Sequence, residues 1–284
     1  MIRDRICHFP AAMTIAGSDS GGGAGIQADL RTFSYFRVFG TSAITAVTSQ
    51  NPLSVTGIEP VRASAVELQI RTVMAEIELS AVKTGMLFSR SILLAAVRCL
   101  AGFPGEIVVD PVMISTSGKK LMKDSAVEAM KKQMLPLATW ITPNIPEAEV
   151  LCGHKIVSLD DCIAAAEECA ARWNCSVVVK GGHSGDCSTA SDVVCHQGEL
   201  RLLETERLPV KKNSDHGTGC TFSAALTALL ARGVAWEQAL IRAKAFISAS
   251  LSESVSLSSS GTYAMFPPEK DLGGYEKRIV CTKL

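Results

Sequence analysis

The sequence predicts an α/β fold in which a mostly parallel sheet carries helices on both faces. Short apolar runs rich in β-branched residues alternate with segments of helical periodicity along most of the chain. Several of these runs end in glycine-rich or polar turns, and the rhythm changes where two strand-like runs flank Gln197-Gly198. Strands buried on both faces read as continuous apolar runs. These observations indicate a doubly wound sandwich with one antiparallel hairpin at a sheet edge.

The first strand–helix unit sets the pattern for the rest of the chain. Residues 12–16 are apolar, a glycine turn follows, and a helical pattern runs through Ile26, Leu30 and Phe33. Further strands are expected at residues 42–47, 81–84, 106–110, 139–142 and 176–180, with helices at 65–77, 92–100, 126–134 and 162–172. The hairpin is expected at residues 192–196 and 199–208, followed by helices near 218–232 and 236–252.

The chain length allows one large domain or two small ones, because 284 residues exceed a typical single domain only moderately. Neither a Pro/Ser-rich linker nor an internal repeat divides the sequence. We therefore expect one domain over residues 1–284, with its core at about residues 12–252. The segment after residue 257 is Ser/Gly-rich and then charged, which predicts a short, loosely packed tail.

Composition narrows the class of protein. Lys plus Arg equals Asp plus Glu at 28 each, so charge does not suggest nucleic acid or an anionic membrane as a partner. The ten cysteines occur singly, without a CxxC pair, as is typical of reduced thiols. The start of the chain lacks the apolar stretch of a signal sequence, and the apolar run at residues 221–231 is too short to span a bilayer. A cytoplasmic enzyme or binding protein is expected.

Ligands of open α/β sheets bind at the carboxyl ends of strands, and the first candidate there is the glycine run at residues 17–25 (GSDSGGGAG). Glycines let backbone N–H groups approach a ligand closely, and the helix start that follows favours an anion or polar group. The run is neither a Walker loop nor a dinucleotide fingerprint, because both spacings are wrong. A flexible turn is the ordinary alternative.

The second candidate is the segment of residues 213–225 (NSDHGTGCTFSAA), in which Gly217 and Gly219 flank Thr218 at the start of a helical run. Several unpaired N–H groups can converge there at the positive end of a helix. That geometry suits a transferring phosphoryl group. Cys220 falls in the first turn, where a thiol pKa is lowered, so it either activates a hydroxyl or is a small buried residue. An ordinary capped helix start is the alternative.

Polar residues at three more strand ends suggest a metal and a phosphate. Asn144 and Glu147 are three apart at a helix start and could hold Mg²⁺ through its waters, although a capping pair is the alternative. Asp110 closes another apolar strand and could join them at the metal, or simply begin a turn. Lys180 ends an apolar strand, where a buried lysine is costly unless it meets an anion, so phosphate is predicted as its partner.

Seven motifs together, in this order and spacing, resemble those of hydroxymethylpyrimidine/phosphomethylpyrimidine kinases of thiamine biosynthesis. This family has the ribokinase-like fold. The resemblance covers about residues 12–250. The motifs are AGSD at 16–19, GGAGIQAD at 22–29, KTGML at 83–87, DPVM at 110–113, TPNIPEA at 142–148, KGGH at 180–183 and HGTGC at 216–220.

The resemblance implies two sequential phosphoryl transfers from MgATP, first to the hydroxymethyl group and then to the resulting monophosphate. It implies a small-molecule pyrimidine substrate held between the first glycine loop and residues 48–51, and a homodimer. Gln50 matches the position that hydrogen-bonds the aminopyrimidine edge, since an amide offers a donor and an acceptor. The other roles carried over are substrate contacts at Gly17, Asp29, Met86 and Val112, catalysis at Gly217, Thr218, Gly219 and Cys220, ATP binding at Lys180, Asn144 and Thr218, and Mg²⁺ binding at Glu147, Asn144 and Asp110.

The sequence departs from the family pattern on the nucleotide side. Ser20-Gly21 replaces a usual Pro-Ser, and Asp215 adds a negative charge near the expected phosphates. A glycine-rich end common in the family is replaced by residues 257–262 (LSSSGT).

Three rival functions remain. A pyridoxal kinase of the same fold is disfavoured by Gln50-Asn51, and a non-catalytic ligand-binding protein on a kinase scaffold is disfavoured by the intact Lys180 and HGTGC segment. A nicotinamide-dependent oxidoreductase lacks its fingerprint.

Overall fold

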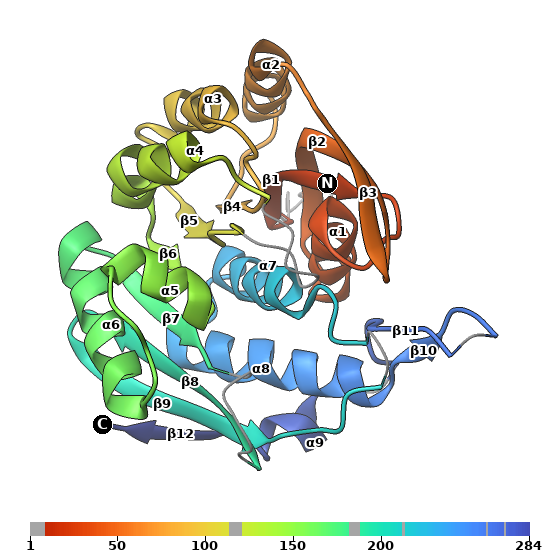
Figure 1. The fold of residues 1–284 in the computed structure, drawn as a ribbon, viewed down its shortest axis with the longest axis vertical. Coiled ribbons are helices and arrows are strands. Elements are labelled where there is room, and N and C mark those ends of the chain that lie inside the picture. The colour runs from red at the N-terminus through yellow and green to blue at the C-terminus, as the bar shows by residue number, and fades with distance from the viewer. Residues whose placement is uncertain (1–8, 114–120, 182–187, 212–213, 260, 270) are drawn as a thin grey trace, which may run out of the picture.

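A ten-stranded sheet with helices on both faces dominates the computed structural model, which describes residues 9–113, 121–181, 188–211, 214–259, 261–269 and 271–284. The strand order is β12-β9-β8-β7-β6-β5-β4-β1-β2-β3 (Figure 1). Strands β2, β1, β4, β5, β6 and β7 pair in parallel, while β3, β8, β9 and β12 pair antiparallel with their neighbours. The predicted mostly parallel α/β sheet is confirmed.

The strands of this sheet are β1 (Ala11–Asp19), β2 (Phe39–Asn51), β3 (Ser54–Pro60), β4 (Ala81–Thr84), β5 (Glu106–Val109), β6 (Trp140–Ile141), β7 (Ser176–Lys180), β8 (Thr189–His196), β9 (Glu199–Glu206) and β12 (Val280–Lys283). A separate two-stranded ribbon joins β10 (Val255–Ser256) to β11 (Tyr263–Ala264).

The helices are α1 (Gly25–Tyr35), α2 (Ala63–Met74), α3 (Arg90–Leu100), α4 (Asp124–Ala129), α5 (Ile145–Cys152), α6 (Leu159–Trp173), α7 (Thr218–Ala231), α8 (Trp236–Ser252) and the short α9 (Gly273–Glu276). The single helix expected at residues 126–134 is instead α4 followed by a π-helical turn, Met130–Met134, and a 3₁₀ turn, Leu135–Leu137. Within the described part of the chain, no helix is both long and apolar enough to cross a membrane.

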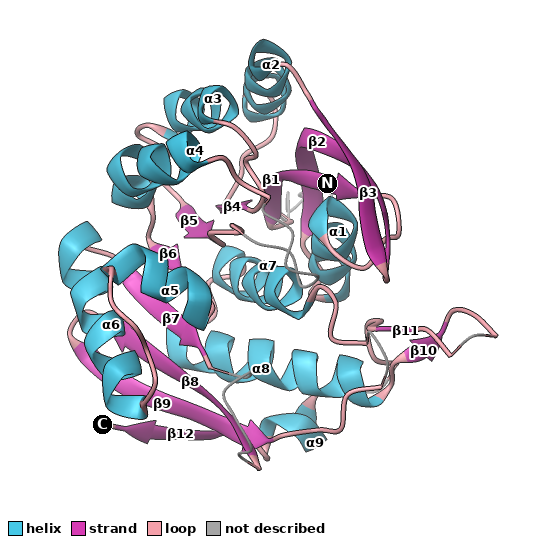
Figure 2. Cartoon of the chain, in the orientation of Figure 1, coloured by secondary structure: helices cyan, strands magenta, loops and turns pink. Residues whose placement is uncertain are grey.

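Side chains alternate between two apolar cores, as the two-sided pattern of the strands requires. In β7, Val177 and Val179 join a core that also holds residues of α2 to α6, whereas Val178 joins the core built by α1, α7 and α8. Figure 2 shows these two helical layers on opposite sides of the sheet. Because α7 packs against β1, β4 and β5, its N-terminus is held near the carboxyl ends of the central strands.

The hairpin β8–β9 is confirmed, but it does not form the sheet edge. Strand β12, from the segment expected to be a loosely packed tail, pairs with β9, and Leu272 and Ile279 of the same segment are buried. That expectation was wrong because the apolar, β-branched residues at 279–282 (IVCT) were outweighed by the charges around them.

A second antiparallel pair, β2–β3, was not predicted. Strand β3 is mostly exposed and has few large apolar residues, so its sequence carries little strand signal.

Candidate active site

Three of the predicted polar residues meet at the ends of neighbouring strands. Asp110 follows β5, Asn144 follows β6, and Lys180 ends β7. Asn144 and Lys180 form a parallel bridge, and Lys180 Nζ donates a hydrogen bond to Asp110 Oδ1 at 3.0 Å. The anion that meets the buried lysine is therefore a carboxylate of the protein itself, where the sequence had suggested phosphate.

Asn144 and Glu147 form the capping box of α5 that was the alternative to metal binding. Asn144 Oδ1 accepts from the Glu147 amide at 2.9 Å, and Glu147 Oε2 accepts from the Asn144 amide at 3.0 Å. Burial raises the pKa of Glu147 to about 7, while the Lys180 ammonium lowers it and Asp110 raises it. Among the described residues, no group of three or more His, Cys, Asp or Glu side chains is arranged to hold a metal ion.

Asp110 nevertheless retains an open acceptor. Its side chain is almost fully buried, and Oδ2 has no hydrogen-bond partner within the described part of the chain. Burial lowers the pKa of the Lys180 ammonium, but the nearby carboxylates of Asp110 and Glu147 raise it by more. The pKa of Lys180 therefore lies above its usual value. Two carboxyl groups and one cation thus share a small buried space next to α5.

The N-terminus of α7 lies against this group. Gly217 precedes the helix with φ of +84°, a conformation that favours glycine, and the Thr221 amide makes the first intrahelical bond, to the Gly217 carbonyl at 2.9 Å. A Cβ at residue 219 would lie 3.2 Å from Lys180 Nζ. The amides of Gly219 and Cys220 precede that first intrahelical bond, so the geometry supplies donors near a fixed cation. This is an anion-binding arrangement.

Cys220 does not have the lowered thiol pKa that its position in a first helical turn had suggested. Burial raises the pKa of the thiol to about 12, although the Lys83 ammonium and a hydrogen bond from the Gly25 amide lower it. The helix terminus therefore does not offset desolvation. In this structure the Cys220 sulfur is a neutral thiol at physiological pH.

Lys83 and Asp29 form a fully buried ion pair. Lys83 Nζ lies 2.9 Å from both carboxylate oxygens of Asp29, and Thr14 Oγ1 donates to Asp29 Oδ2 at 2.6 Å. Burial raises the pKa of Asp29 and Lys83 lowers it. Because the Asp29 side chain has no exposed surface, the expectation that it contacts substrate does not fit this geometry.

Lys83 was missed as a site residue. The argument applied to Lys180, that a lysine in a buried apolar strand needs an anion, would have found it.

The first glycine loop is organised by Asp19, which the sequence reading also left unassigned. Asp19 Oδ1 accepts from the Gly21 amide at 2.9 Å, and Oδ2 accepts from the Ala24 amide at 2.8 Å. His216 Nε2 lies 3.2 Å from the same Oδ2. Burial raises the pKa of Asp19, but the hydrogen bonds from His216 and from the loop amides outweigh it and hold the pKa below its usual value.

The two glycine segments pack directly against each other. A Cβ at residue 23 would lie 2.5 Å from His216 Cδ2, and a Cβ at residue 217 would collide with the Gly23 carbonyl. The segments at 17–25 and 214–220, far apart in sequence, therefore form one wall of the site.

Gln50 extends this wall from β2. Ser20 Oγ donates to the Gln50 carbonyl and accepts from the Gln50 amide, each at 2.8 Å, so this serine fixes the backbone of Gln50. The Gln50 side chain lies 2.9 Å from His216 Nε2. Gln50 is partly exposed.

Apolar residues predicted to line the substrate pocket do lie together. Met86 and Val112 belong to a small cluster with Ala46, Leu121 and Ile58, separate from the two main cores. A Cβ at residue 17 would lie 2.5 Å from Met86 Cε, so the methionine methyl covers Gly17. Gly182, His183 and Asn213 of the quoted motifs lie outside the described residues.

The family model named Phosphomethylpyrimidine kinase matches residues 19–264, which include the site residues described above from Asp19 onward. The chain belongs to the phosphomethylpyrimidine kinase family. It is a phosphotransferase with the ribokinase-like fold that the sequence predicted.

Relatives in several bacteria support this assignment. The chain is 44% identical to the hydroxymethylpyrimidine/phosphomethylpyrimidine kinase of Bacillus subtilis over 83% of this chain and 87% of that protein. It is also 44% identical to the enzyme of the same name from Haemophilus influenzae, over 86% of this chain and 92% of that protein. A pyridoxine kinase of Bacillus subtilis is 38% identical over 87% and 92% of the two chains.

Solved structures of pyridoxal kinases share the fold. The Staphylococcus aureus enzyme in complex with pyridoxal superposes with a TM-score of 0.83 at 32% identity, covering 97% of this chain and 99% of that one. The ADP complex of the Bacillus subtilis enzyme has a TM-score of 0.82 at 36% identity, covering 91% and 97%.

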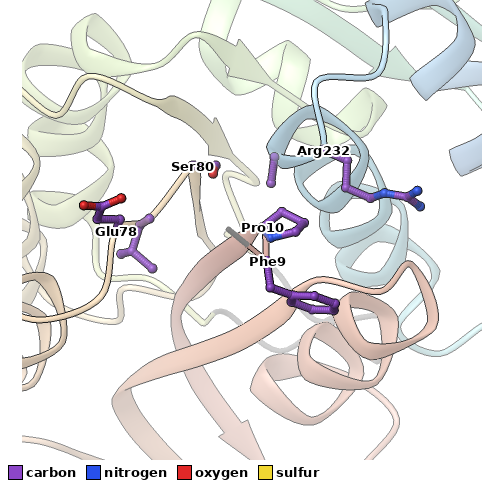
Figure 3. A pocket seen from close by; sticks show the side chains of 7 residues that line it. Phe9, Pro10, Glu78, Ser80 and Arg232 are labelled. Atoms are coloured by element: carbon purple, nitrogen blue, oxygen red, sulfur yellow. The ribbon is translucent and has the colours of Figure 1, made fainter. Parts of the chain in front are cut away.

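A pocket of about 530 Å³ lies away from the candidate site described above. Figure 3 shows the side chains that line it. It is lined by Phe9, Pro10, Glu78, Leu79, Ser80, Ala231 and Arg232. Phe9 and Pro10 precede β1, Ser80 precedes β4, and Arg232 follows α7. The pocket is thus at the amino ends of the strands, opposite the candidate site.

Proposed function

We propose that the chain transfers a phosphoryl group from ATP to the hydroxymethyl group of hydroxymethylpyrimidine and then to the resulting monophosphate, in thiamine biosynthesis. The observation that carries the proposal is the N-terminus of α7 lying against Lys180 and Asp110 in a chain whose relatives bear this activity in their names. Amide donors at a helix start, beside a fixed cation, fit a phosphoryl group whose charge spreads over its oxygens.

In the proposed reaction the amides of Gly217, Gly219 and Cys220 hold the moving phosphoryl group, while the Thr218 amide already donates to the Asp215 carbonyl at 3.2 Å. Their position is set by the rigid start of α7, so they need little rearrangement as charge develops. Lys180, Asn144 and Thr218 would contact the phosphates of ATP. Lys180 already has its ammonium 3.2 Å from the position of a Cβ at residue 219, which places its charge beside the cradle.

One carboxylate oxygen among the described residues of the site is available to bind Mg²⁺ directly. Asp110 Oδ2 is buried and lacks a partner in the described residues, while both Asn144 and Glu147 are engaged in the capping box. We therefore propose Asp110 as the direct protein ligand, with Asn144 and Glu147 acting through water. Mg²⁺ usually takes only one or two carboxylates along with substrate phosphates, and it neutralises their charge.

Cys220 is proposed to act at the hydroxyl of the substrate. Because burial holds the pKa of its thiol at about 12, deprotonation of that hydroxyl by the sulfur requires that bound substrate lower the thiol pKa. Among the described residues, the Lys83 ammonium already lowers the pKa of the Cys220 thiol.

For pyrimidine recognition, we propose Gly17 and Gln50 on one side and Met86 and Val112 as the apolar wall. The small cluster around Met86 is detached from both main cores, as expected for a wall that faces a ligand rather than another layer of helices. Gln50 supplies the polar contact. Asp29 acts from within the fold through Lys83.

A pyridoxal kinase is the second candidate, favoured by the high structural similarity to the Staphylococcus aureus pyridoxal kinase. One coupled assay with MgATP decides between them by comparing hydroxymethylpyrimidine, its monophosphate and pyridoxal. A kcat/KM at least tenfold higher for both pyrimidines supports the proposal. A preference for pyridoxal would replace it, and no turnover of any of the three would favour the ligand-binding alternative.

We also propose a homodimer in the cytoplasm. The eight cysteines in the described residues are all free thiols, which fits a reducing compartment. Light scattering coupled to size exclusion would give twice the 30.1 kDa chain mass for the dimer.

A further inference from the structure

We propose that His216 orients the carboxamide of Gln50 and so determines whether a donor or an acceptor of that amide faces the substrate. His216 is then a positioning residue for substrate recognition, contributed by the segment that also forms the phosphoryl cradle. The inference rests on the proposed function in one respect only, namely that Gln50 faces the pyrimidine.

The evidence is a three-residue arrangement around one ring nitrogen. His216 Nε2 lies 2.9 Å from Gln50 Nε2 and 3.2 Å from Asp19 Oδ2. The three residues come from the segment before α7, from the end of β2 and from the end of β1. One imidazole nitrogen therefore contacts a carboxylate and a carboxamide at the same time.

The carboxylate decides which form of the ring is stable. Asp19 has a lowered pKa and is ionised at neutral pH, so it accepts only. A lone pair on His216 Nε2 would face that negative oxygen at 3.2 Å, which is repulsive, whereas a proton on Nε2 is attracted to it. Asp19 thus favours the ring form that carries a proton on Nε2.

A protonated Nε2 fixes the amide in turn. Two donors cannot share a hydrogen bond, so Gln50 must direct its oxygen toward His216 Nε2–H, by exchanging the ends of its amide at the same 2.9 Å position. The NH₂ end is then left to face the cleft. Gln50 consequently offers a donor to an acceptor of the substrate, such as a ring nitrogen of the pyrimidine edge.

The ring has little freedom to move away. Gly23 lies so close that a Cβ there would sit 2.5 Å from His216 Cδ2, and Asp19 is itself held by the amides of Gly21 and Ala24. The Gln50 backbone is fixed by Ser20. All three partners are therefore anchored, which leaves the amide rotation as the variable that His216 controls.

A double-mutant cycle on the full chain tests the coupling. Gln50→Leu, His216→Phe and the double variant are compared for kcat/KM with hydroxymethylpyrimidine. We expect His216→Phe to lower kcat/KM about tenfold, mainly through KM, and to add less than twofold when Gln50 is already Leu. His216→Gln, which retains a donor, should recover part of the loss.

The matched control is His154→Phe, which removes an exposed histidine paired with Glu168 outside the cleft and should change nothing. The inference would be overturned if the fold-loss in kcat/KM of the double variant equalled the product of the two single fold-losses. His216 would then serve the cradle or the fold independently of Gln50.

A second measurement needs no turnover, so it separates this inference from the proposed function. The chain has five histidines, and ¹⁵N spectra of the imidazole nitrogens identify the protonated nitrogen of each, with His216→Phe giving the assignment. We expect a proton on Nε2 of His216 near pH 7. A His216 ring protonated only on Nδ1 would overturn the inference, even if the chain phosphorylates the pyrimidine. A proton on Nε2 supports it, even if the chain prefers another substrate.

Discussion

Lys180 Nζ donates to Asp110 Oδ1 at 3.0 Å, so the cation beside the cradle and the acceptor proposed for Mg²⁺ neutralise each other in the ligand-free protein. Both side chains are largely buried, with 14% and 3% of their surfaces exposed. Binding of MgATP would have to redistribute this pair, with the ammonium moving toward phosphate and the carboxylate toward the metal.

This pair leads to a prediction for Lys180→Met. Loss of one partner leaves Asp110 buried without its cation, so we expect a loss of about 3 kcal/mol of unfolding free energy and a KM for ATP raised at least tenfold. Adding Asp110→Asn should restore much of the stability but not the activity. Urea denaturation and steady-state kinetics measure the two effects. If the double variant recovered ATP use, the pair would be structural only.

The two glycines that flank Thr218 should respond differently to substitution. Gly219→Asp places an anion against the cradle, while the nearest described atom to its Cβ is Nζ at the end of the Lys180 side chain, so turnover should vanish with the fold retained. Gly217→Ala forces a side chain into φ of +84° and into the Gly23 carbonyl, so it should lower stability by at least about 1 kcal/mol. Thermal unfolding and activity distinguish the two, and equal unfolding temperatures would contradict this division.

The Cys220 thiol should react slowly with iodoacetamide at neutral pH. A pKa raised to about 12 keeps the thiol protonated below that value, so its alkylation rate should rise about tenfold per pH unit between pH 7 and 10 without a plateau. Mass spectrometry of the Cys220 peptide follows the rate, with Cys220→Ser confirming the site. A plateau near pH 7 to 8 would instead show a thiolate already formed, as the sequence had suggested.

Removing Lys83 should be among the most destabilising single changes in the protein. Lys83→Met leaves Asp29 charged and fully buried, which costs about 3–5 kcal/mol, whereas Lys83→Met with Asp29→Leu should regain most of the loss. Lys155→Met is the control, because its ion pair with Glu149 is exposed and contributes at most about 1 kcal/mol. A small effect of Lys83→Met in urea denaturation would mean that Asp29 takes up a proton without loss.

The sequence predicted what repeats along the chain and what has a strong local signal. The strands that end at Thr84 and Lys180 are apolar runs, so their existence and parallel order could be inferred from composition alone. Strand β3 could not be, because an exposed edge strand needs no apolar residues.

In the site, the glycine pair at 217 and 219 could be recognised as a candidate binding segment from the sequence, because two glycines exceed what a helix start requires. The ion-pair partners of the buried charged residues were harder to predict from the sequence. Pairing of Lys180 with Asp110, and of Asp29 with Lys83, depends on which side chains face each other across strands, which the sequence does not encode locally. The raised pKa of Cys220 depends on burial, which the helix-terminus argument leaves out.

The contact between Asp19 and His216 joins residues 197 positions apart in the sequence. This separation determines how late in synthesis the two halves of the site can come together. At about 5–20 residues per second, roughly ten to forty seconds of translation separate the first glycine loop from the segment that completes the site. From the completion of β5 at Val109 onward, the nascent chain has β1, β4 and β5 but not α7, which packs against these strands. A growing chain therefore exposes an apolar sheet face until α7 has been made and can cover it.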